Sequence, residues 1–272
     1  MPEGERLHHF FAEKGQVGEK TIVLTGSDVH HARQVLRIRP GEEILISDGT
    51  GGDYRCVVRS LNEQEILAEI LCVEKDRELP SFLVLYQSLV KGEKMEWIIQ
   101  KAVELGVSRI VPVASENTVV KLEKKKEESR CRRWQAIAES AAKQSKRSKI
   151  PKIGSVLTLK EALNDAGSCP VRFFAYEHED GMQGTVRELQ KVKAGQAIAV
   201  FVGPEGGYSP DEVKLAGEYG ILPVSLGRRI LRAETAGLAL LSVLMMNLEC
   251  AGENLLCPQK QGKEETEDGG VF

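Results

Sequence analysis

The stretch AVFVGPEGGYSPDEV, residues 199–213, decides the fold class of this chain. The apolar run AIAVFV (197–202) has the composition of a buried strand, and a glycine-rich turn joins it to SPDE (209–212). In SPDE the serine suits an N-cap, the proline suits the first helical position, and the glutamate three residues after the cap completes a capping box. We therefore expect a strand, a turn and a helix that ends near Gly220.

The same alternation of strand and helix runs through residues 82–251, which indicates an α/β fold with a parallel sheet. Each predicted strand is a short apolar run, and each predicted helix has apolar residues at helical spacing. The further strands are FLVLYQ (82–87), RIVPVA (109–114), RFFAYE (172–177) and ILPVSL (221–226), and the helices cover 93–106, 129–146 and 234–251.

The first 75 residues have a different pattern. Three strand-like runs lie within residues 42–75, and Asp48, Gly49, Gly51 and Gly52 suit a hairpin turn between the first two. SDVHHARQVLRIRPG (27–41) predicts a short helix with Ser27 as its N-cap. KDRELPS (75–81) suits a linker. We expect a small β domain over 1–75, an α/β domain over 76–252, and a polar, disordered tail over 253–272.

Composition narrows the class of protein. Of 272 residues, 42% are apolar, and no apolar run predicts a membrane span or a signal peptide, so we expect a soluble, cytoplasmic protein. The cysteines lack metal-ligand spacing, which predicts neither a metal nor a disulfide framework. The net charge is −3, yet residues 121–152 hold 12 Lys and Arg against 4 Glu. On the predicted helix these charges form an outward stripe, which suits nucleic acid, although a solvated helical face would have the same composition.

Two glycine-bearing loops are the candidate binding site. GPEGG (203–207) follows one strand, and LGRRILRAETA (226–236) follows the next, so both belong at the carboxyl edge of the sheet, where α/β proteins bind ligands. Neither loop has a phosphate-binding fingerprint, and Glu205 would repel a pyrophosphate. Arg232 lies between apolar neighbours, which suits stabilisation of negative charge.

The pairing of GPEGGYSPDE with LGRRILRAETA resembles the RsmE family of SPOUT-superfamily methyltransferases, which act on N3 of a uridine in 16S ribosomal RNA. The blocks LVKGEKMEWIIQKAVELGV, RRWQAIAESAAKQSKRSKIP and HHARQVLRIRPGEEI extend the resemblance over nearly the whole chain. It implies a PUA-like, RNA-binding β-barrel, a SPOUT domain with a C-terminal trefoil knot, S-adenosylmethionine as cofactor, and a homodimer. It also implies the decoding region of the RNA, or the assembled small ribosomal subunit, as the acceptor.

The resemblance also implies a set of cofactor-binding residues. They come from both loops and from the end of the preceding strand: Tyr176, Glu177, Gly203, Pro204, Gly206, Gly207, Leu226, Gly227, Ile230, Leu231 and Arg232. Apolar walls and backbone hydrogen bonds suit adenine and a sulfonium better than a phosphate cradle would. Two residues depart from the family pattern, because His9 and Asn117 stand where arginine is common; both would face RNA.

For catalysis, N3 of uracil must lose its proton before it accepts a methyl group. We assign Arg232 to stabilisation of the resulting anion and leave the base open between Glu205 and Glu234. A structural ion pair between Arg232 and Glu234 is the alternative. For RNA contact the candidates are Arg33, Arg37, Lys143, Gln144 and Arg147.

Other functions remain open from the sequence. A related SPOUT enzyme that methylates transfer RNA would share these motifs. A non-catalytic ribosome-assembly factor would explain the basic helix but not the two loops, and a nucleotide-binding metabolic enzyme would explain the loops but not the basic helix.

Overall fold

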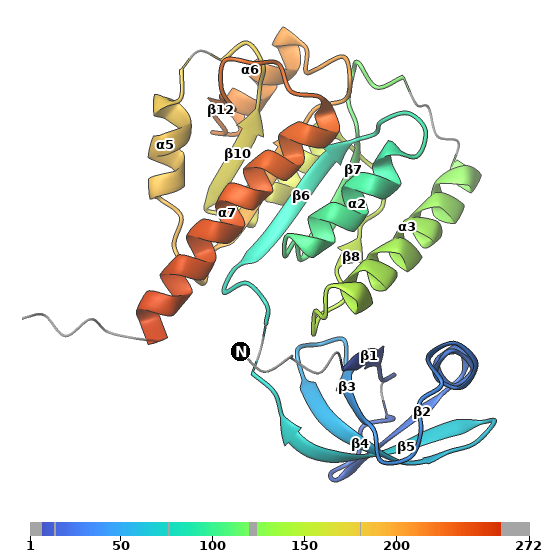
Figure 1. Ribbon diagram of the computed structural model, residues 1–272. Coiled ribbons are helices and arrows are strands. Elements are labelled where there is room, and N and C mark those ends of the chain that lie inside the picture. Colours follow the sequence, from blue (N-terminus) through green and yellow to red (C-terminus); the bar gives the residue numbers. More distant parts are fainter. Residues whose placement is uncertain (1–6, 14, 76, 120–123, 180, 257–272) are drawn as a thin grey trace, which may run out of the picture.

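A computed structural model describes residues 7–13, 15–75, 77–119, 124–179 and 181–256. Within them the chain forms two sheets, one above the other in Figure 1. The smaller sheet lies within residues 8–73 and the larger begins at Phe82. The proposed domain limits at residues 75 and 252 stay a prediction. Part of the basic segment and the tail from residue 257 lie outside the described residues.

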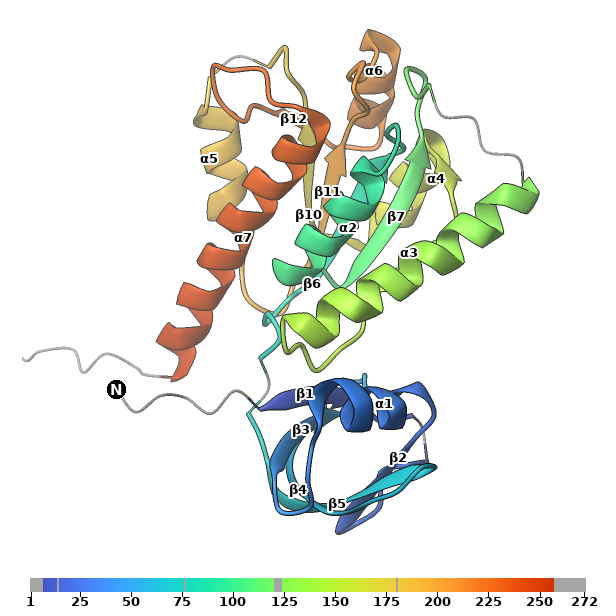
Figure 2. The same cartoon turned by 45° about the vertical axis from the view of Figure 1, so that its right-hand side comes forward.

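The smaller sheet has the order β1-β3-β4-β5-β2 and curls around its own core (Figure 2). Its strands are β1 (His8–Phe11), β2 (Thr21–Thr25), β3 (Glu43–Ser47), β4 (Asp53–Leu61) and β5 (Glu65–Val73). The predicted hairpin turn between β3 and β4 is confirmed, because Asp48 Oδ1 accepts hydrogen bonds from the N–H groups of Thr50, Gly51 and Gly52. The side chains inside the curl, such as Ile22, Ile44 and Ile66, are fully buried.

The predicted helix after residue 27 is present but differs in its start and its form. It comprises α1 (Ser27–His30) and a wider π-helical turn, η1 (His31–Leu36). Ser27 is not the N-cap: Gly26, at a φ of 78°, holds that position without a side-chain hydrogen bond. The segment ends at Arg37, whose φ of 56° is in the left-handed region.

All strand pairs of the larger sheet within the described residues are parallel, as the alternation of strands and helices predicts. Its order is β12-β10-β11-β6-β7-β8, with β9 also paired to β7. The strands are β6 (Phe82–Ser88), β7 (Arg109–Ala114), β8 (Lys152–Ile153), β9 (Leu157–Thr158), β10 (Val171–Ala175), β11 (Ala197–Val202) and β12 (Pro223–Val224).

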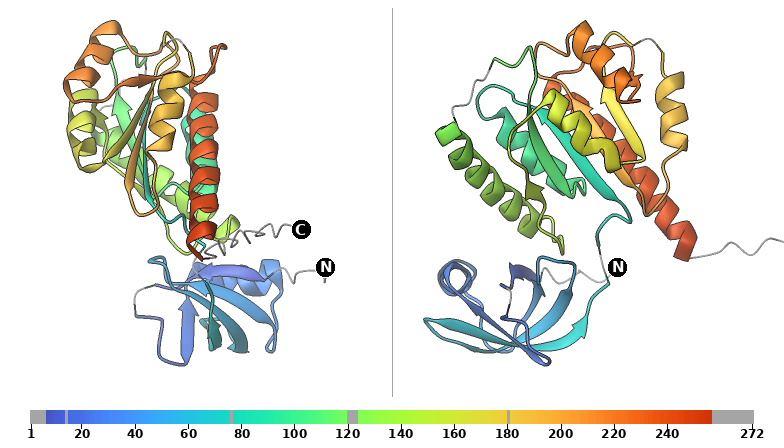
Figure 3. Two further views of the ribbon diagram at one scale, coloured as in Figure 1. Left: turned by 90° about the vertical axis from the view of Figure 1, so that its left-hand side faces the viewer. Right: turned by 180° about the vertical axis from the view of Figure 1, so that it is seen from behind.

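Helices cover both faces of this sheet. One face carries α2 (Lys94–Glu104), α3 (Lys124–Gln144) and α7 (Ala233–Leu256), and the other carries α4 (Leu159–Asp165), which leads into the short η2 (Ala166–Ser168), and α6 (Pro210–Glu218), as Figure 3 shows from behind. The remaining helix, α5 (Gln183–Gln190), packs by β10. The sequence did not predict α4 or α5. A separate apolar cluster fills each face.

The start of α6 and the end of α7 can be compared with the sequence prediction. The capping box of α6 is confirmed: Ser209 Oγ accepts from the N–H of Glu212, whose carboxylate accepts from the N–H of Ser209. The predicted end of α7 at Gly252 is wrong, because the helix continues to Leu256. The predicted trefoil knot of this C-terminal part stays a prediction.

Residues Ala233–Cys250 of α7 have the length and composition of a membrane span. Core helices of soluble proteins also meet that test. Leu240, Leu241, Leu244 and Leu248 are buried in the cluster that α7 shares with α2 and the sheet. We therefore interpret α7 as a core helix.

Candidate functional site

The two glycine-bearing loops meet at the carboxyl edge of the larger sheet. GPEGG follows β11 and LGRRILRAETA follows β12. These strands are consecutive in the chain but are not neighbours in the sheet, since β10 lies between them. The end of β10 therefore brings Tyr176 and Glu177 between the loops. This order explains why three strand ends, rather than two, contribute to one site.

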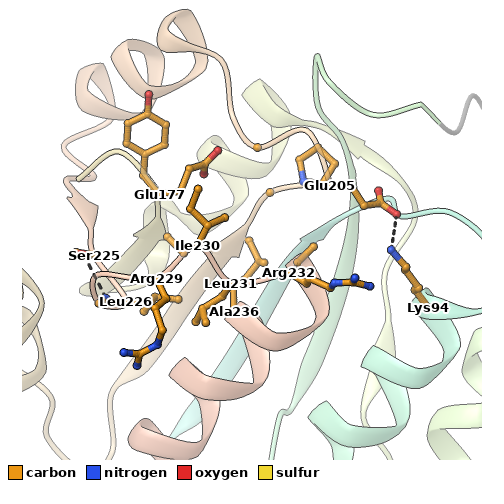
Figure 4. A pocket seen from close by; sticks show the side chains of 18 residues that line it. Lys94, Glu177, Glu205, Ser225, Leu226, Arg229, Ile230, Leu231, Arg232 and Ala236 are labelled. Atoms are coloured by element: carbon orange, nitrogen blue, oxygen red, sulfur yellow. Dashed lines mark hydrogen bonds and ion pairs between the residues drawn. The ribbon is translucent and has the colours of Figure 1, made fainter. Parts of the chain in front are cut away.

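A cavity of about 370 Å³ opens between these strand ends (Figure 4). Its volume lies in the range of small-molecule sites, roughly 300–1,000 Å³. Every predicted cofactor residue except Gly206 lines it, together with residues that the sequence did not single out. The full lining is Lys94, Ala175, Tyr176, Glu177, Val202, Gly203, Pro204, Glu205, Gly207, Ser225, Leu226, Gly227, Arg229, Ile230, Leu231, Arg232, Ala233 and Ala236.

The wall of the cavity suits a ligand with an apolar ring and few charges. Leu226, Leu231 and Ile230 supply apolar surface, and Ile230 is 81% exposed at the mouth. Gly207 has a φ of 66°, and a β-carbon on it would collide with the Glu177 carboxylate. Glycine at 207 therefore lets that carboxylate lie directly against the loop, where it can accept hydrogen bonds from ligand hydroxyl groups.

Charged side chains gather on the other side of the cavity. Lys94 Nζ lies 3.1 Å from Glu205 Oε1 and 3.9 Å from Glu234 Oε2. Glu205 Oε1 also accepts from the N–H of Lys91. Burial alone would raise the pKa of Glu205, but the hydrogen bonds from Lys91, its own N–H and Lys94 hold that pKa below its ordinary value. Glu205 is therefore a poor proton acceptor.

Glu234 differs from Glu205 in its hydrogen bonding. Its Oε2 is closed to solvent and accepts no hydrogen bond. Arg232 is exposed, in contrast to the enclosed position that its apolar neighbours suggested. Among the described residues no ion pair joins Arg232 to Glu234, so the structure offers no support for the alternative structural pairing. Figure 4 shows the Arg232 guanidinium directed toward Glu205 and Lys94.

Asn117 is exposed, and it also holds the first loop through two hydrogen bonds. Its Nδ2 donates to the carbonyl oxygens of Gly206 and Gly207, each at 3.2 Å. Asn117 is exposed, so the expectation that it faces RNA stays a prediction. A second bond from the same turn joins the N–H of Glu116 to the carboxylate of Glu212, at the start of α6.

The predicted RNA-contact residues fall into two groups. Arg33 is half-buried and Arg37 is exposed on the smaller sheet's helical segment, while Gln144 is exposed at the end of α3. Lys143 instead pairs with Asp28 at 3.1 Å, across the junction between the two sheets. Arg147 is buried, which argues against the RNA contact predicted for it.

Arg147 and His9 belong to the junction between the two sheets and the linker. The Arg147 guanidinium pairs with Glu78 and donates to the carbonyl oxygens of Val103 and Val107. His9 Nδ1 donates to the carbonyl oxygen of Lys143, and its Nε2 lies 2.6 Å from Ser47 Oγ. Burial lowers the pKa of His9 to about 4. His9 is thus a neutral contact inside the protein, which corrects its assignment to an RNA-facing surface.

Family models of known proteins match both parts of the chain. A family model described as an RNA methyltransferase domain matches residues 77–245, and one described as an RNA methyltransferase PUA domain matches residues 24–71. The chain is 34% identical to ribosomal RNA small subunit methyltransferase E of Bacillus subtilis, over 89% of this chain and 98% of that protein.

Two solved structures resemble the larger and smaller sheets together. Ribosomal RNA small subunit methyltransferase E from Neisseria gonorrhoeae, bound to S-adenosylmethionine, has 33% identity and a TM-score of 0.77, covering 88% of this chain and 97% of that one. A putative methyltransferase from Legionella pneumophila, also with S-adenosylmethionine, has 29% identity and a TM-score of 0.76, covering 89% and 98%.

Proposed function

Since the chain belongs to the ribosomal RNA small subunit methyltransferase E family, we propose that it methylates N3 of a uridine in the decoding region of 16S ribosomal RNA. The enzyme uses S-adenosylmethionine. The observation that carries the proposal is the cavity at the ends of β10, β11 and β12, which has apolar walls on one side and a cluster of charges on the other.

The residues that would hold the cofactor follow from the lining of the cavity. Leu226, Ile230 and Leu231 suit the adenine ring, backbone groups of GPEGG suit its polar edges, and the Glu177 carboxylate suits the ribose hydroxyls. Bound S-adenosylmethionine supplies a methyl group activated by its sulfonium. The chain's own task is then to align an acceptor nitrogen and to remove its proton.

We infer that Glu234, rather than Glu205, accepts the N3 proton. Glu205 is already held by two donors from the start of α2, and its lowered pKa makes it a weak base. Glu234 lies behind the lining of the cavity and its Oε2 is closed to solvent, so its other oxygen, Oε1, would accept the proton, and among the described residues no ion pair shorter than the 3.9 Å contact with Lys94 holds this carboxylate. Arg232, exposed beside the cavity, would stabilise the negative charge on the uracil carbonyl oxygens.

The acceptor RNA would lie along the exposed basic surface of both parts of the chain. Arg33 and Arg37 on the smaller sheet and Arg130, Arg132 and Gln144 on α3 remain accessible enough to contact phosphates. Each phosphate contact adds to the salt dependence of binding. Because the proposed acceptor is ribosomal RNA, we place the enzyme in the cytoplasm.

We also propose that the enzyme is a homodimer. On α7, Val243 and Met246 are 45% and 62% exposed, and Ile230 at the mouth of the cavity is also exposed. Val243 and Met246 share one face of the helix because they are three residues apart. Sedimentation equilibrium should show a dimer, and lysine at both α7 positions should shift it to monomer; a wild-type monomer would contradict this.

The test of the proposed reaction is nucleoside mapping. The enzyme is incubated with methyl-labelled S-adenosylmethionine and, in parallel, with small ribosomal subunits, naked 16S RNA and transfer RNA from cells that lack the activity. We expect N3-methyluridine from the ribosomal acceptors alone. Label in transfer RNA would indicate the related transfer RNA enzyme, and cofactor binding without any transfer would contradict a catalytic function.

A further inference from the structure

Lys94 is the one lining residue of the cavity that comes from α2. No sequence motif singled it out, yet its ammonium lies at the charged side of the site, in contact with Glu205 at 3.1 Å (Figure 4). It also lies 3.9 Å from Glu234, which lies behind the lining. The two carboxylates come from different elements, the loop after β11 and the start of α7. They fix a side chain that is 36% exposed and would otherwise sample many rotamers.

The charges around Lys94 show which partner its remaining donors can take. The groups that face it are Glu205, Glu234 and the guanidinium of Arg232, with Lys91 and Glu93 next to it on its own segment. An ammonium has three donors and Glu205 takes one of them at hydrogen-bond distance. Glu234 is too far for a hydrogen bond, so donors of Lys94 remain for a ligand that enters beside the cavity.

We propose that Lys94 is a substrate-facing catalytic residue, whose ammonium donates to one uracil carbonyl oxygen while Arg232 donates to the other. This inference rests on the proposed uridine-N3 reaction. Uracil has a carbonyl oxygen on each side of N3–H. Two cations therefore match the two carbonyl acceptors of that edge, and a carboxylate such as Glu234, 3.9 Å from Lys94, matches its N3–H donor. Cytosine has an amino group in place of one carbonyl, and that amino group offers no acceptor to a cation.

The two cations stabilise the charge that develops in the step. The N3–H bond breaks and its proton passes to Glu234. The N3 electron pair then forms the bond to the methyl carbon, and the carbon–sulfur bond breaks with its electron pair left on sulfur. Negative charge is delocalised onto both carbonyl oxygens as the proton leaves, and a cation at each oxygen lowers the barrier.

Lys94→Met removes the charge and keeps much of the side-chain volume, Lys94→Arg keeps the charge, and Lys101→Met is the matched control. Lys101 lies on the same helix and pairs with Glu104, away from the cavity. Methyl transfer to small subunits is measured at saturating S-adenosylmethionine, with cofactor affinity measured by calorimetry. We expect Lys94→Met to lower the rate by about 10²–10³ at neutral pH. Lys94→Arg should retain most of the wild-type rate. The cofactor affinity of Lys94→Met and the rate of Lys101→Met should both match wild type.

The pH dependence separates this proposal from a role in loop anchoring alone. At mildly alkaline pH uridine ionises more readily by itself, so the deficit of Lys94→Met should shrink. A wild-type rate for Lys94→Met would overturn the inference and leave the proposed function intact. The same holds if Lys94→Met loses rate equally at neutral and at mildly alkaline pH and also binds the cofactor more weakly. No transfer by wild-type enzyme to any RNA would overturn both.

Discussion

Two arginines, Arg232 and Arg147, show how differently the cavity and the domain junction use the same side chain. Arg232 is exposed at the mouth of the cavity, and it makes no ion pair with any other described residue. Arg147 is 6% exposed, pairs with Glu78 and donates to two backbone carbonyls. Both lie in basic segments of the sequence.

The difference separates binding from architecture. A buried, fully paired guanidinium stabilises one arrangement of the chain and has no donors left for a ligand. An exposed guanidinium contributes little to stability, and its donors remain available. We therefore expect changes at the junction to alter stability and changes at the cavity to alter binding or rate. The predictions below test that division.

The largest effect is expected for Arg147→Ala. It leaves Glu78 buried without its guanidinium partner, which should lower the free energy of unfolding by about 3–5 kcal/mol. Urea unfolding measures the change, and Arg132→Ala, at an exposed position on α3, is the control. Unfolding curves for Arg147→Ala and Arg132→Ala that coincide would contradict the structural assignment.

His9 should make the junction sensitive to acid. Its pKa is lowered to about 4 by burial, whereas an unfolded histidine titrates near 6.5. Between these two values the unfolded chain binds more protons, so stability falls as the pH drops from about 6.5 to about 4, by at most about 3 kcal/mol. Comparison of wild type with His9→Gln isolates this part of the acid sensitivity. Equal losses in the two proteins would show that His9 titrates normally.

Gly207→Ala should weaken cofactor binding without unfolding the protein. The β-carbon would be strained at a φ of 66°, which costs about 1–2 kcal/mol of stability. It would also displace Glu177 from the cofactor, which should lower affinity by about tenfold, or about 1.4 kcal/mol. Calorimetry with S-adenosylmethionine measures it. Gly184→Ala is the control because nothing lies within 4 Å of its new β-carbon. Unchanged affinity in Gly207→Ala would argue against this cavity as the cofactor site.

Lys143→Ala should have the smallest effect. Its ion pair with Asp28 is partly exposed, so its loss should cost about 0.2–1 kcal/mol. If Lys143 acts mainly at the junction, the slope of RNA affinity against salt concentration should stay at the wild-type value, whereas Arg37→Ala should reduce it. A reduced slope for Lys143→Ala would return this residue to the RNA-contact group.

The strands and helices could be predicted from the sequence because they depend on local periodicity. AIAVFV and SPDE predicted β11 and the capped start of α6, and both are present. The position of β10 between β11 and β12 could not be predicted, because strand order depends on long-range pairing. Likewise, burial of Arg147 depends on Glu78, 69 residues away. Lys94 was missed because only the folded chain brings the start of α2 to Glu205.

The most direct test of the central claim is the methyl-transfer rate of Arg232→Ala at saturating S-adenosylmethionine, with small ribosomal subunits as acceptor. The account predicts a rate lower by about 10²–10³, as for loss of a donor to a developing oxyanion, with the unfolding curve unchanged. A wild-type rate for this variant would contradict the assignment of the exposed arginine to catalysis.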